Sequence, residues 1–372
     1  MRYLKLLPAA LAVSLMSAGL SQAQNMTVTP YGFLKFDLAY DQARTAPGDY
    51  ALYVLPDSEK DNQMSITARQ TRLGARFAVK APIVVSGRFE SDFYNGLVTT
   101  ADNKSTIMMR HAFVRVDFSG WYLLAGQTSD VISPLVPTTV NYTVLWDQGN
   151  IGYRMPQLQF GNTGSPFQVI GALSRNVPAN DVDGNKIDDG ADSGVPTVQA
   201  SASWTTARGT LGVSGHYGVM EYRDIAGKKE NYHTTSINLS ARCQATPALL
   251  LQGEAFSGRN LAQFFGGIGQ DFDNRLQDVE TVGGWANATV TCANGLQYTL
   301  GAGIDDPDED AASAFPSRTF NSDYYVNLYV PVAANTQFAA EVSYLTTKFF
   351  NAFGAEDDIS GVRLQTAFIM NF

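Results

Sequence analysis

The chain has 372 residues, of which 45% are hydrophobic and 16% charged, and its formal net charge is −9. This acidic balance disfavours a nucleic-acid partner, whose phosphates require a basic surface. The mean hydropathy of −0.11 suits a soluble protein, but a membrane barrel averages the same because lipid-facing and lumen-facing residues alternate.

Residues 1–23 have the pattern of a cleavable signal peptide. Arg2 and Lys5 form a basic start, Leu6 to Leu20 is an apolar run, and Ser21-Gln22-Ala23 offers small residues for cleavage. The alternative is a membrane anchor, but the run is shorter than the ~20 residues that a spanning helix needs. We therefore expect an exported chain whose folded part is residues 24–372.

From residue 24 onward the dominant hydrophobic period is two, which predicts strands rather than helices. The last strand shows this best, because its two faces differ throughout. One face carries Val362, Leu364, Thr366, Phe368, Met370 and Phe372. The same alternation recurs over 31–41 and 84–94, and no linker divides 24–372, so we expect one all-β domain.

The connections between these strands distinguish a soluble sandwich from a transmembrane barrel. Short turns fall at 81–82, 119–120, 162–164, 207–209, 245–247, 293–295 and 333–335. Long loops fall between them, at 44–62, 95–104, 128–150, 177–193, 223–232, 258–278, 306–319 and 349–359. Outer-membrane barrels place short turns at one end and long loops at the other. The alternation predicts a transmembrane antiparallel β-barrel of 16 strands, with 14 or 18 as alternatives.

Two segments resemble the DcaP-like porins. They are Arg69–Gly74 (RQTRLG) on the second strand and Gly149–Gln157 (GNIGYRMPQ) after the third long loop. The resemblance implies a homotrimeric outer-membrane channel that passes small, often anionic organic acids. The terminal Phe372 also resembles the signal that the barrel assembly machinery recognises, so we expect the outer membrane of a Gram-negative type bacterium and contact with its lipid.

Charged residues on the inward parity of the early strands are the candidate lining of a pore. They are Lys35, Arg72, Arg76, Arg88, Glu90, Asp92, Arg115, Asp117 and Arg154. A charge on the lipid side costs ~2–4 kcal/mol at the membrane midplane, which favours the inward orientation. Fixed positive charge in a pore favours anions. The alternative is that these arginines pair with neighbouring acids and only stiffen the wall.

Arg69 and Arg110 fall on the lipid-facing parity of their strands. Either a bulge shifts the register, or these residues meet a neighbouring subunit or lipid head groups. The sequence leaves both open.

The loop at 128–150 lies where porins fold a loop into the lumen. Its apolar content is high for an exposed loop, and we expect it to fold inward and narrow the bore. The alternative is a loop that caps a subunit interface. The residues that we expect at the constriction are Leu135, Tyr142, Trp146 and Asp147.

The segment Asp181–Asp189 resembles a calcium-binding loop, with oxygen ligands at alternate positions and a glycine for the turn. The candidate ligands are Asp181, Asp183, Asn185 and Asp188. It lacks the glutamate of an EF-hand, and a solvated acidic loop is the preferred interpretation. Cys243 and Cys292 lie beside turns on strands that should not be adjacent, so two free cysteines are preferred to a disulfide.

The pattern favours a porin that forms a water-filled channel for passive diffusion of small hydrophilic solutes, with a preference for anions such as organic (di)carboxylates. An outer-membrane enzyme of the phospholipase kind and a structural or adhesive barrel are the alternatives. The three histidines, His111, His216 and His233, have no metal-ligand spacing, and no enzyme motif stands in a suitable context. We therefore expect neither a cofactor nor an enzymatic activity.

Overall fold

The computed structural model describes residues 26–56, 61–80, 83–94, 105–164, 166–176, 181–272, 277–308, 317–350 and 355–372. The expected signal peptide at 1–23 and the expected turn at 81–82 lie outside these residues. The strands are β1 (Met26–Asp41), β2 (Thr45–Ala46), β3 (Tyr53–Val54), β4 (Gln63–Thr67), β5 (Arg72–Val79), β6 (Val84–Asp92), β7 (Met108–Phe118), β8 (Trp121–Ser129), β9 (Arg154–Asn162), β10 (Phe167–Ser174), β11 (Thr197–Thr205), β12 (Gly209–Arg223), β13 (Lys229–Gln244), β14 (Leu249–Arg259), β15 (Glu280–Thr291), β16 (Gln297–Pro307), β17 (Ser317–Ala333), β18 (Thr336–Phe350) and β19 (Glu356–Asn371). The short helices are α2 (Asp189–Asp192), η3 (Ala262–Phe264) and η4 (Gly267–Gly269).

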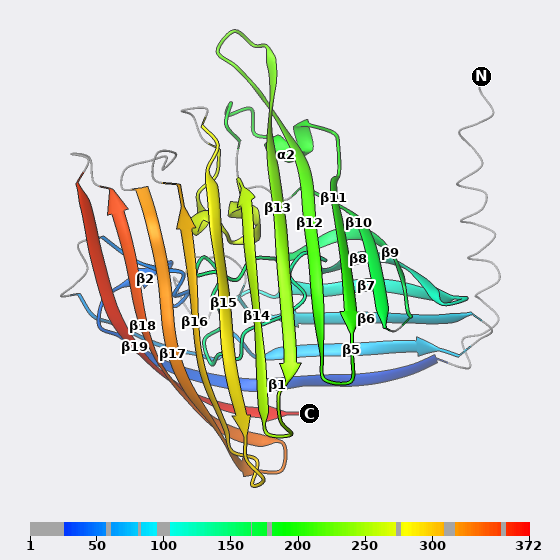
Figure 1. The fold of residues 1–372 in the computed structure, drawn as a ribbon, viewed down its shortest axis with the longest axis vertical. Helices are drawn as coiled ribbons and strands as arrows, with labels where there is room; N and C mark the ends of the chain where they lie inside the picture. Colours follow the sequence, from blue (N-terminus) through cyan, green and yellow to red (C-terminus); the bar gives the residue numbers. More distant parts are fainter. Residues whose placement is uncertain are drawn as a thin grey trace.

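All of these strands except β2 and β3 form one antiparallel sheet that closes on itself (Figure 1), and β2 pairs with β3 in a separate two-stranded sheet. Neighbours in sequence pair from β5 to β19, and β19 pairs with β1 from Asn371 opposite Phe33 to Arg363 opposite Asp41. β4 and β5 both pair with β1, so they occupy a single position in the wall. The described residues therefore form a closed barrel of 16 strands, which confirms the prediction.

The two faces of the wall differ as the period of two requires. On β19 the side chains of Leu364 and Phe368 are exposed, whereas Arg363 and Gln365 are buried. On β1 the exposed Phe36 alternates in the same way with the buried Asp37. Because the apolar row lies outside, the barrel presents to lipid the surface that a transmembrane strand needs.

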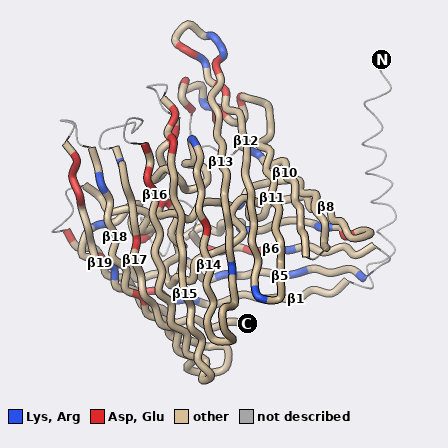
Figure 2. The backbone as a smooth tube through the Cα atoms, viewed as in Figure 1, with Lys and Arg blue, Asp and Glu red and all other residues tan. Residues whose placement is uncertain are grey.

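The long connections gather at one end of the barrel, where acidic residues are also concentrated along the backbone (Figure 2). β12 and β13 continue beyond the rim at this end as a tall hairpin, paired up to Arg223 opposite Lys229. The connection there is therefore residues 224–228, shorter than the predicted 223–232. No helix among the described residues is long and apolar enough to cross a membrane.

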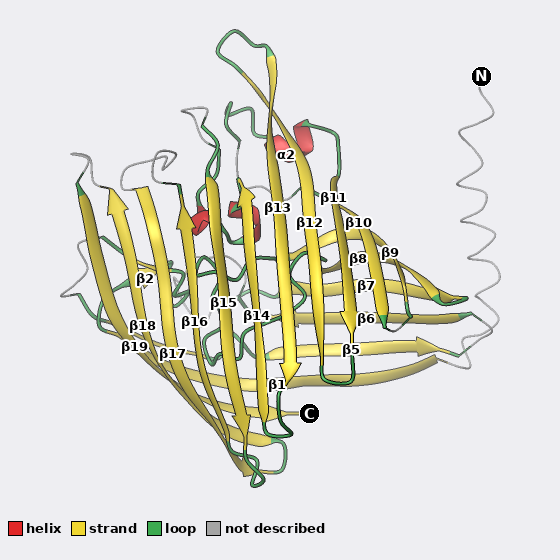
Figure 3. Cartoon of the chain, viewed as in Figure 1, coloured by secondary structure: helices red, strands yellow, loops and turns green. Residues whose placement is uncertain are grey.

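Three segments from this end lie inside the ring of strands (Figure 3). We call them loop 1 (residues 42–56), loop 3 (residues 130–153) and loop 6 (residues 260–272). Loop 1 packs Ala51 and Val54 against Leu345 and Phe349 on the inner face of β18. The interior of the barrel is thus filled from the loop end by chain that is not part of the wall.

Candidate functional site

The basic wall

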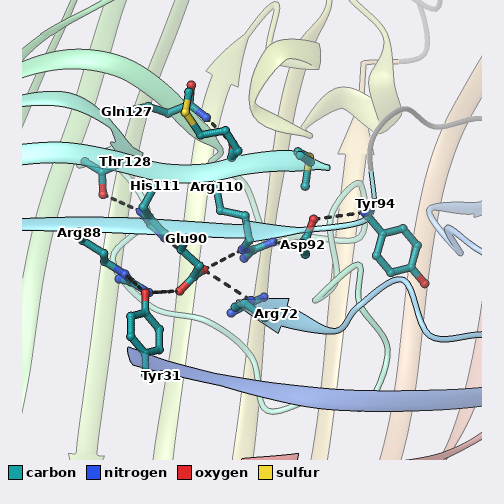
Figure 4. A network of polar contacts seen from close by, with 12 residues as sticks. Tyr31, Arg72, Arg88, Glu90, Asp92, Tyr94, Arg110, His111, Gln127 and Thr128 are labelled. Atoms are coloured by element: carbon teal, nitrogen blue, oxygen red, sulfur yellow. Dashed lines mark hydrogen bonds and ion pairs between the residues drawn. The ribbon is translucent and has the colours of Figure 1, made fainter. Parts of the chain in front are cut away.

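A buried carboxylate, Glu90 on β6, lies at the centre of a cluster of arginines (Figure 4). Its Oε1 accepts a hydrogen bond from Nε of Arg110 at 2.9 Å and lies 3.4 Å from Nε of Arg72. Its Oε2 accepts one from the hydroxyl of Tyr31 at 2.7 Å and pairs with Arg88. Charge-assisted hydrogen bonds of this kind are the strong ones, so Glu90 fixes the positions of three guanidinium groups.

Arg110 reaches this cluster because β7 contains a bulge. The register between β6 and β7 shifts between Glu90 and Ser91, which leaves Arg110 without a cross-strand partner. A bulge of one residue reverses the face on which a side chain lies. Of the two possibilities left open by the sequence, the bulge is the one found, and Nη1 of Arg110 donates to Asp92 at 2.6 Å.

Arg69 also points inward, for a different reason. It lies in the interruption between β4 and β5, where the chain leaves the regular ladder. Its guanidinium pairs with Asp49 of loop 1 and lies 4.5 Å from the ring centroid of Tyr94. The strand break therefore places a buried ion pair between the wall and loop 1.

The remaining predicted residues of this wall differ in how their charge is compensated. Arg115 pairs with Asp117 at 2.6 Å, and Arg76 lies 4.3 Å from the ring centroid of Tyr31. Lys35 is 5% exposed, pairs with Asp37 at 3.0 Å and donates to the carbonyl of Val140. The structure thus covers Lys35 with loop 3, and the prediction that it lines an open pore is wrong in that respect.

The inner loops

Loop 3 lies against the opposite wall, where two carboxylates accept hydrogen bonds from its N–H and O–H groups. Glu341 on β18 accepts from the backbone N–H groups of Val140 at 2.6 Å and Asn141 at 3.0 Å. Glu254 on β14 accepts from the hydroxyl of Ser133 at 2.6 Å and from the N–H of Leu135 at 2.9 Å. These acids are buried beneath the loop, so their negative charge is directed into loop backbone rather than into the lumen.

Close backbone approaches complete this contact. A Cβ at Gly303 of β16 would overlap the carbonyl oxygen of Gln148, and one at Gly149 would overlap the carbonyl oxygen of Gly284. Gly149 also has φ of +105°, a value that L side chains rarely adopt. Glycine at these positions allows loop 3 to lie flat against the wall.

Aromatic rings connect the three inner loops. Tyr142 of loop 3 lies 5.2 Å from Tyr50 of loop 1, measured between ring centroids. Trp146 of loop 3 stacks on Phe265 of loop 6 at 4.5 Å and meets Tyr153 at 5.6 Å. Loops 1 and 6 were predicted only as long polar loops, although Phe264, Phe265 and Ile268 already gave loop 6 an apolar segment that could have signalled burial.

Asp147 belongs to the packing between loops 3 and 6. It is 1% exposed, and its backbone N–H donates to the carbonyl of Phe265 at 3.0 Å. Burial, and then the nearby carboxylate of Asp305, raise the pKa of Asp147 to about 8. The expectation that Asp147 lies at the constriction surface is wrong in this structure, because the residue is enclosed between the two loops.

The cavity between loop 3 and the basic wall

A cavity of about 420 Å³ separates loop 3 from the basic wall. Three cationic side chains line it, from Arg72, Arg110 and Arg154. Leu135, Tyr142 and Trp146, three of the four residues predicted at the constriction, line its other side together with Tyr153.

Among the described lining residues, Asp130 is the one carboxylate. Its oxygens accept backbone N–H groups from Ile132, Ser133 and Tyr153. Burial raises the pKa of Asp130 to about 6, and Glu90 and Asp92 lie behind the arginines with 1% and 0% exposure. The cavity is therefore electropositive at its surface, with its compensating acids set back.

Other predicted sites

The acidic segment at 181–189 uses its carboxylates locally. Asp181 accepts from the N–H groups of Asn185 at 2.9 Å and Lys186 at 2.8 Å, and Asp183 accepts from that of Arg223 at 2.8 Å. Asp188 caps α2 and pairs with Arg175 at 2.8 Å. Within the described part of the chain, no group of three His, Cys, Asp or Glu side chains could hold a metal ion.

The cysteines and histidines are dispersed over the barrel. Cys243 at the end of β13 and Cys292 after β15 are both free, as preferred from the sequence. His216 has Ser236 and Thr234 at 2.8 and 2.9 Å from its ring nitrogens, and His111 has Thr128 at 3.0 Å. These contacts are structural hydrogen bonds on separate strands.

Comparison with known proteins

No protein-family model matches the sequence, and no curated protein matches it. Solved structures do match the fold. The outer-membrane channel DcaP of Acinetobacter baumannii has a TM-score of 0.79 at 18% identity, over 94% of this chain and 98% of that one. An anion-selective porin from Comamonas acidovorans has a TM-score of 0.62 at 12% identity, over 93% and 100%.

A third structure, OmpT of Vibrio cholerae in its trimer form, has a TM-score of 0.61 at 11% identity, over 93% of this chain and 99% of that one. At these identities the likeness concerns the fold. The closed 16-stranded ring and its long loops at one end agree with it. The chain has the fold of the outer-membrane porins, with the DcaP channel among its structural neighbours.

Proposed function

We propose that this protein is an outer-membrane porin through which small hydrophilic solutes diffuse passively, with a preference for organic anions. The observation that carries the proposal is the cavity between loop 3 and the basic wall, where Arg72, Arg110 and Arg154 face the space. In a narrow passage of low dielectric, fixed charge is felt more strongly than on an open surface.

The placement of the acidic residues also supports a preference for anions over cations. Glu254 and Glu341 lie under loop 3 and accept its N–H and O–H donors, while Glu90 and Asp92 lie behind guanidinium groups. A cation that enters the cavity meets arginine side chains first. The anion-selective porin of Comamonas acidovorans shares the fold, which makes an anion channel of this architecture reasonable.

The remaining parts of the proposal concern export and assembly. Residues 1–23 would be removed as a signal peptide on export, and the C-terminal strand with Phe372 would bind the barrel assembly machinery. A homotrimer is proposed because OmpT of Vibrio cholerae, with the same fold, has a trimer form. The chain would act without a cofactor and without enzymatic activity.

Reconstitution into planar bilayers tests the proposal. The purified protein should open stepwise conductances without an energy source, and a KCl gradient should give a reversal potential of the sign expected for chloride preference. Silent bilayers from correctly folded barrel would refute the porin, and a cation-selective reversal potential would refute the anion preference.

A further inference from the structure

The arginines of the lumen fall into two groups according to whether an acid compensates their charge. Arg88 pairs with Glu90, Arg110 with Glu90 and Asp92, Arg115 with Asp117, and Arg363 with Asp41 at 2.9 Å. Arg72 lies within 3.4 Å of Glu90. Arg115 and Arg363 each form a neutral pair with one acid, whereas Arg72, Arg88 and Arg110 share the two carboxylates of Glu90 and Asp92 and keep one net positive charge between them.

Arg76 also has no ion pair with a described residue, but it lies outside the lining of the cavity, whereas Arg154 lies within it. Arg154 differs from the paired group in several respects. It is the first residue of β9, at the point where loop 3 returns to the wall, and it is 8% exposed. The structure gives its side chain no ion pair with any described residue, and its Nη2 has no hydrogen-bond partner among them. The carboxylate of Asp130 lines the same cavity and attracts Arg154 electrostatically, but its oxygens accept backbone N–H groups instead of the guanidinium. A buried guanidinium without a partner is costly, so its presence requires a reason.

Aromatic rings hold Arg154 in place. Its Cζ lies 4.6 Å from the ring centroid of Tyr153 and 5.7 Å from that of Trp146. Trp146 in turn stacks on Phe265 of loop 6. Stacking on aromatic faces stabilises a cation without supplying a hydrogen-bond acceptor, so the rings fix the guanidinium while its charge stays available.

The surroundings of Arg154 in the cavity are partly apolar. Leu135, Val136, Pro137 and Val144 line the same space as the three arginines. An inorganic anion would use only the charges, whereas an organic anion can use both kinds of contact. The cavity volume of about 420 Å³ is large enough for a small organic anion.

We propose that Arg154 is the residue that determines solute specificity in this channel, by binding the carboxylate of a small organic acid whose apolar body lies against loop 3. The inference rests on the proposed porin function and names the residue that governs it. It assigns the main role to Arg154 rather than to the arginines that Glu90 and Asp117 compensate. Bidentate pairing of a guanidinium with a carboxylate also explains arginine in preference to lysine at this position.

Two charge-matched variants of the full chain test the assignment. Arg154→Gln and Arg115→Gln each replace a positively charged guanidinium by a neutral amide. The two sites are comparable because both guanidinium groups lie over an aromatic ring, that of Arg115 at 3.9 Å from the ring centroid of Tyr122. Arg115 differs in having Asp117 as its partner and in lying outside the residues that line the cavity. Folding of each variant is checked by the heat-dependent shift of the barrel on gels.

The first measurement is the reversal potential in a KCl gradient. Arg154→Gln should lower the ratio of chloride to potassium permeability by roughly an order of magnitude, because a unit positive charge at about 5 Å in water favours chloride and disfavours potassium by about fourfold each. Arg115→Gln should change the ratio much less. Equal ratios in the wild type and Arg154→Gln, with an anion-selective wild type, would overturn the role of Arg154 and leave the porin function standing.

The second measurement uses benzoate as the probe and follows saturable reduction of the ion current. The wild type should show half-reduction at a defined benzoate concentration, and Arg154→Lys should keep chloride preference but need at least several-fold more benzoate. This lysine variant also carries the test if the glutamine variant does not fold. Unchanged benzoate sensitivity in Arg154→Lys would overturn carboxylate binding, whereas a wild type without anion preference would refute the proposed function itself.

Discussion

Gly32 and Phe372 exchange two backbone hydrogen bonds, from N–H of Gly32 to the carbonyl of Phe372 at 3.0 Å and in the reverse direction at 3.1 Å. They close the barrel where β1 meets the C-terminal end of β19. A Cβ on Gly32 would lie 2.9 Å from the Phe372 ring and would overlap the carbonyl oxygen of Arg72. The last residue of the chain is therefore packed against a position that admits only glycine.

Replacing Gly32 with valine should reduce the amount of folded barrel, because the new side chain overlaps the backbone of β5 at Arg72 and crowds the Phe372 ring where β1 meets β19. Gly171→Val on β10 is the matched control, since a Cβ there meets nothing within 4 Å. The measurement is the fraction of heat-modifiable barrel in outer-membrane extracts. Equal fractions for the two variants would contradict the closure argument.

Replacing Gly303 with alanine should displace loop 3 from the wall and into the cavity. The added methyl group overlaps the carbonyl oxygen of Gln148, and backbone on both sides leaves little room to relax. We expect a lower single-channel conductance from a barrel that still folds. Gly171→Ala should conduct as the wild type does, and a wild-type conductance in Gly303→Ala would show that loop 3 does not narrow the passage.

Glu341→Ala should loosen loop 3, because it leaves the N–H groups of Val140 and Asn141 without an acceptor. Each buried donor left unpaired costs ~1–3 kcal/mol. The expected result is increased open-channel current noise and faster proteolytic cleavage within 130–153. Glu230→Ala, on the exposed β12–β13 hairpin, removes an equal charge and should leave both readouts unchanged; a quiet, protease-resistant Glu341→Ala channel would be evidence against this role.

The pH dependence should show the ionisation of Asp147. Its pKa in the fold, about 8, lies above the ordinary value, so between about pH 4 and pH 8 the folded chain retains a proton that the unfolded chain has lost. The contribution to stability therefore decreases as pH rises through this window and levels off above pH 8.

We expect the thermal midpoint of barrel unfolding to be higher at pH 5 than at pH 9, and loop-dependent current noise to increase as pH passes about 8. Asp147→Asn removes the ionisation while keeping an acceptor for the N–H of Gly269. It should show a smaller difference between the two pH values. The same pH dependence in Asp147→Asn would assign the effect to another group.

Much of the fold could be predicted from sequence because a lipid-facing wall imposes a strict alternation on every strand. The period of two identified the strands, and the alternation of short turns and long loops gave their number. The same rule misplaced Arg69 and Arg110, since parity holds only while the ladder is regular. The break between β4 and β5 turns Arg69 inward, and the bulge in β7 turns Arg110 inward. Neither irregularity leaves a clear mark in the local sequence.

The site was less predictable, because its geometry depends on contacts between segments far apart in the chain. Inward parity identified Arg72, Arg88 and Arg154 but could not tell which of them a carboxylate compensates. Asp147 was expected at a surface and is instead enclosed by loop 6, a segment that the sequence presented as an outer loop. Burial of this kind is decided by the partner loop, and no local pattern records it.

The stacking of Trp146 on Phe265 and the edge-to-face contact of Tyr142 with Tyr50 have a consequence for how this channel can vary. Because loops 1, 3 and 6 share one set of ring contacts, a substitution in any of them changes the fit of the other two. Transplanting loop 3 alone from another barrel would leave Tyr50 and Phe265 facing foreign side chains, and the energetic effects of changes in the three loops would not add. Natural or designed changes of selectivity in this architecture should therefore arise as coordinated substitutions across the three loops.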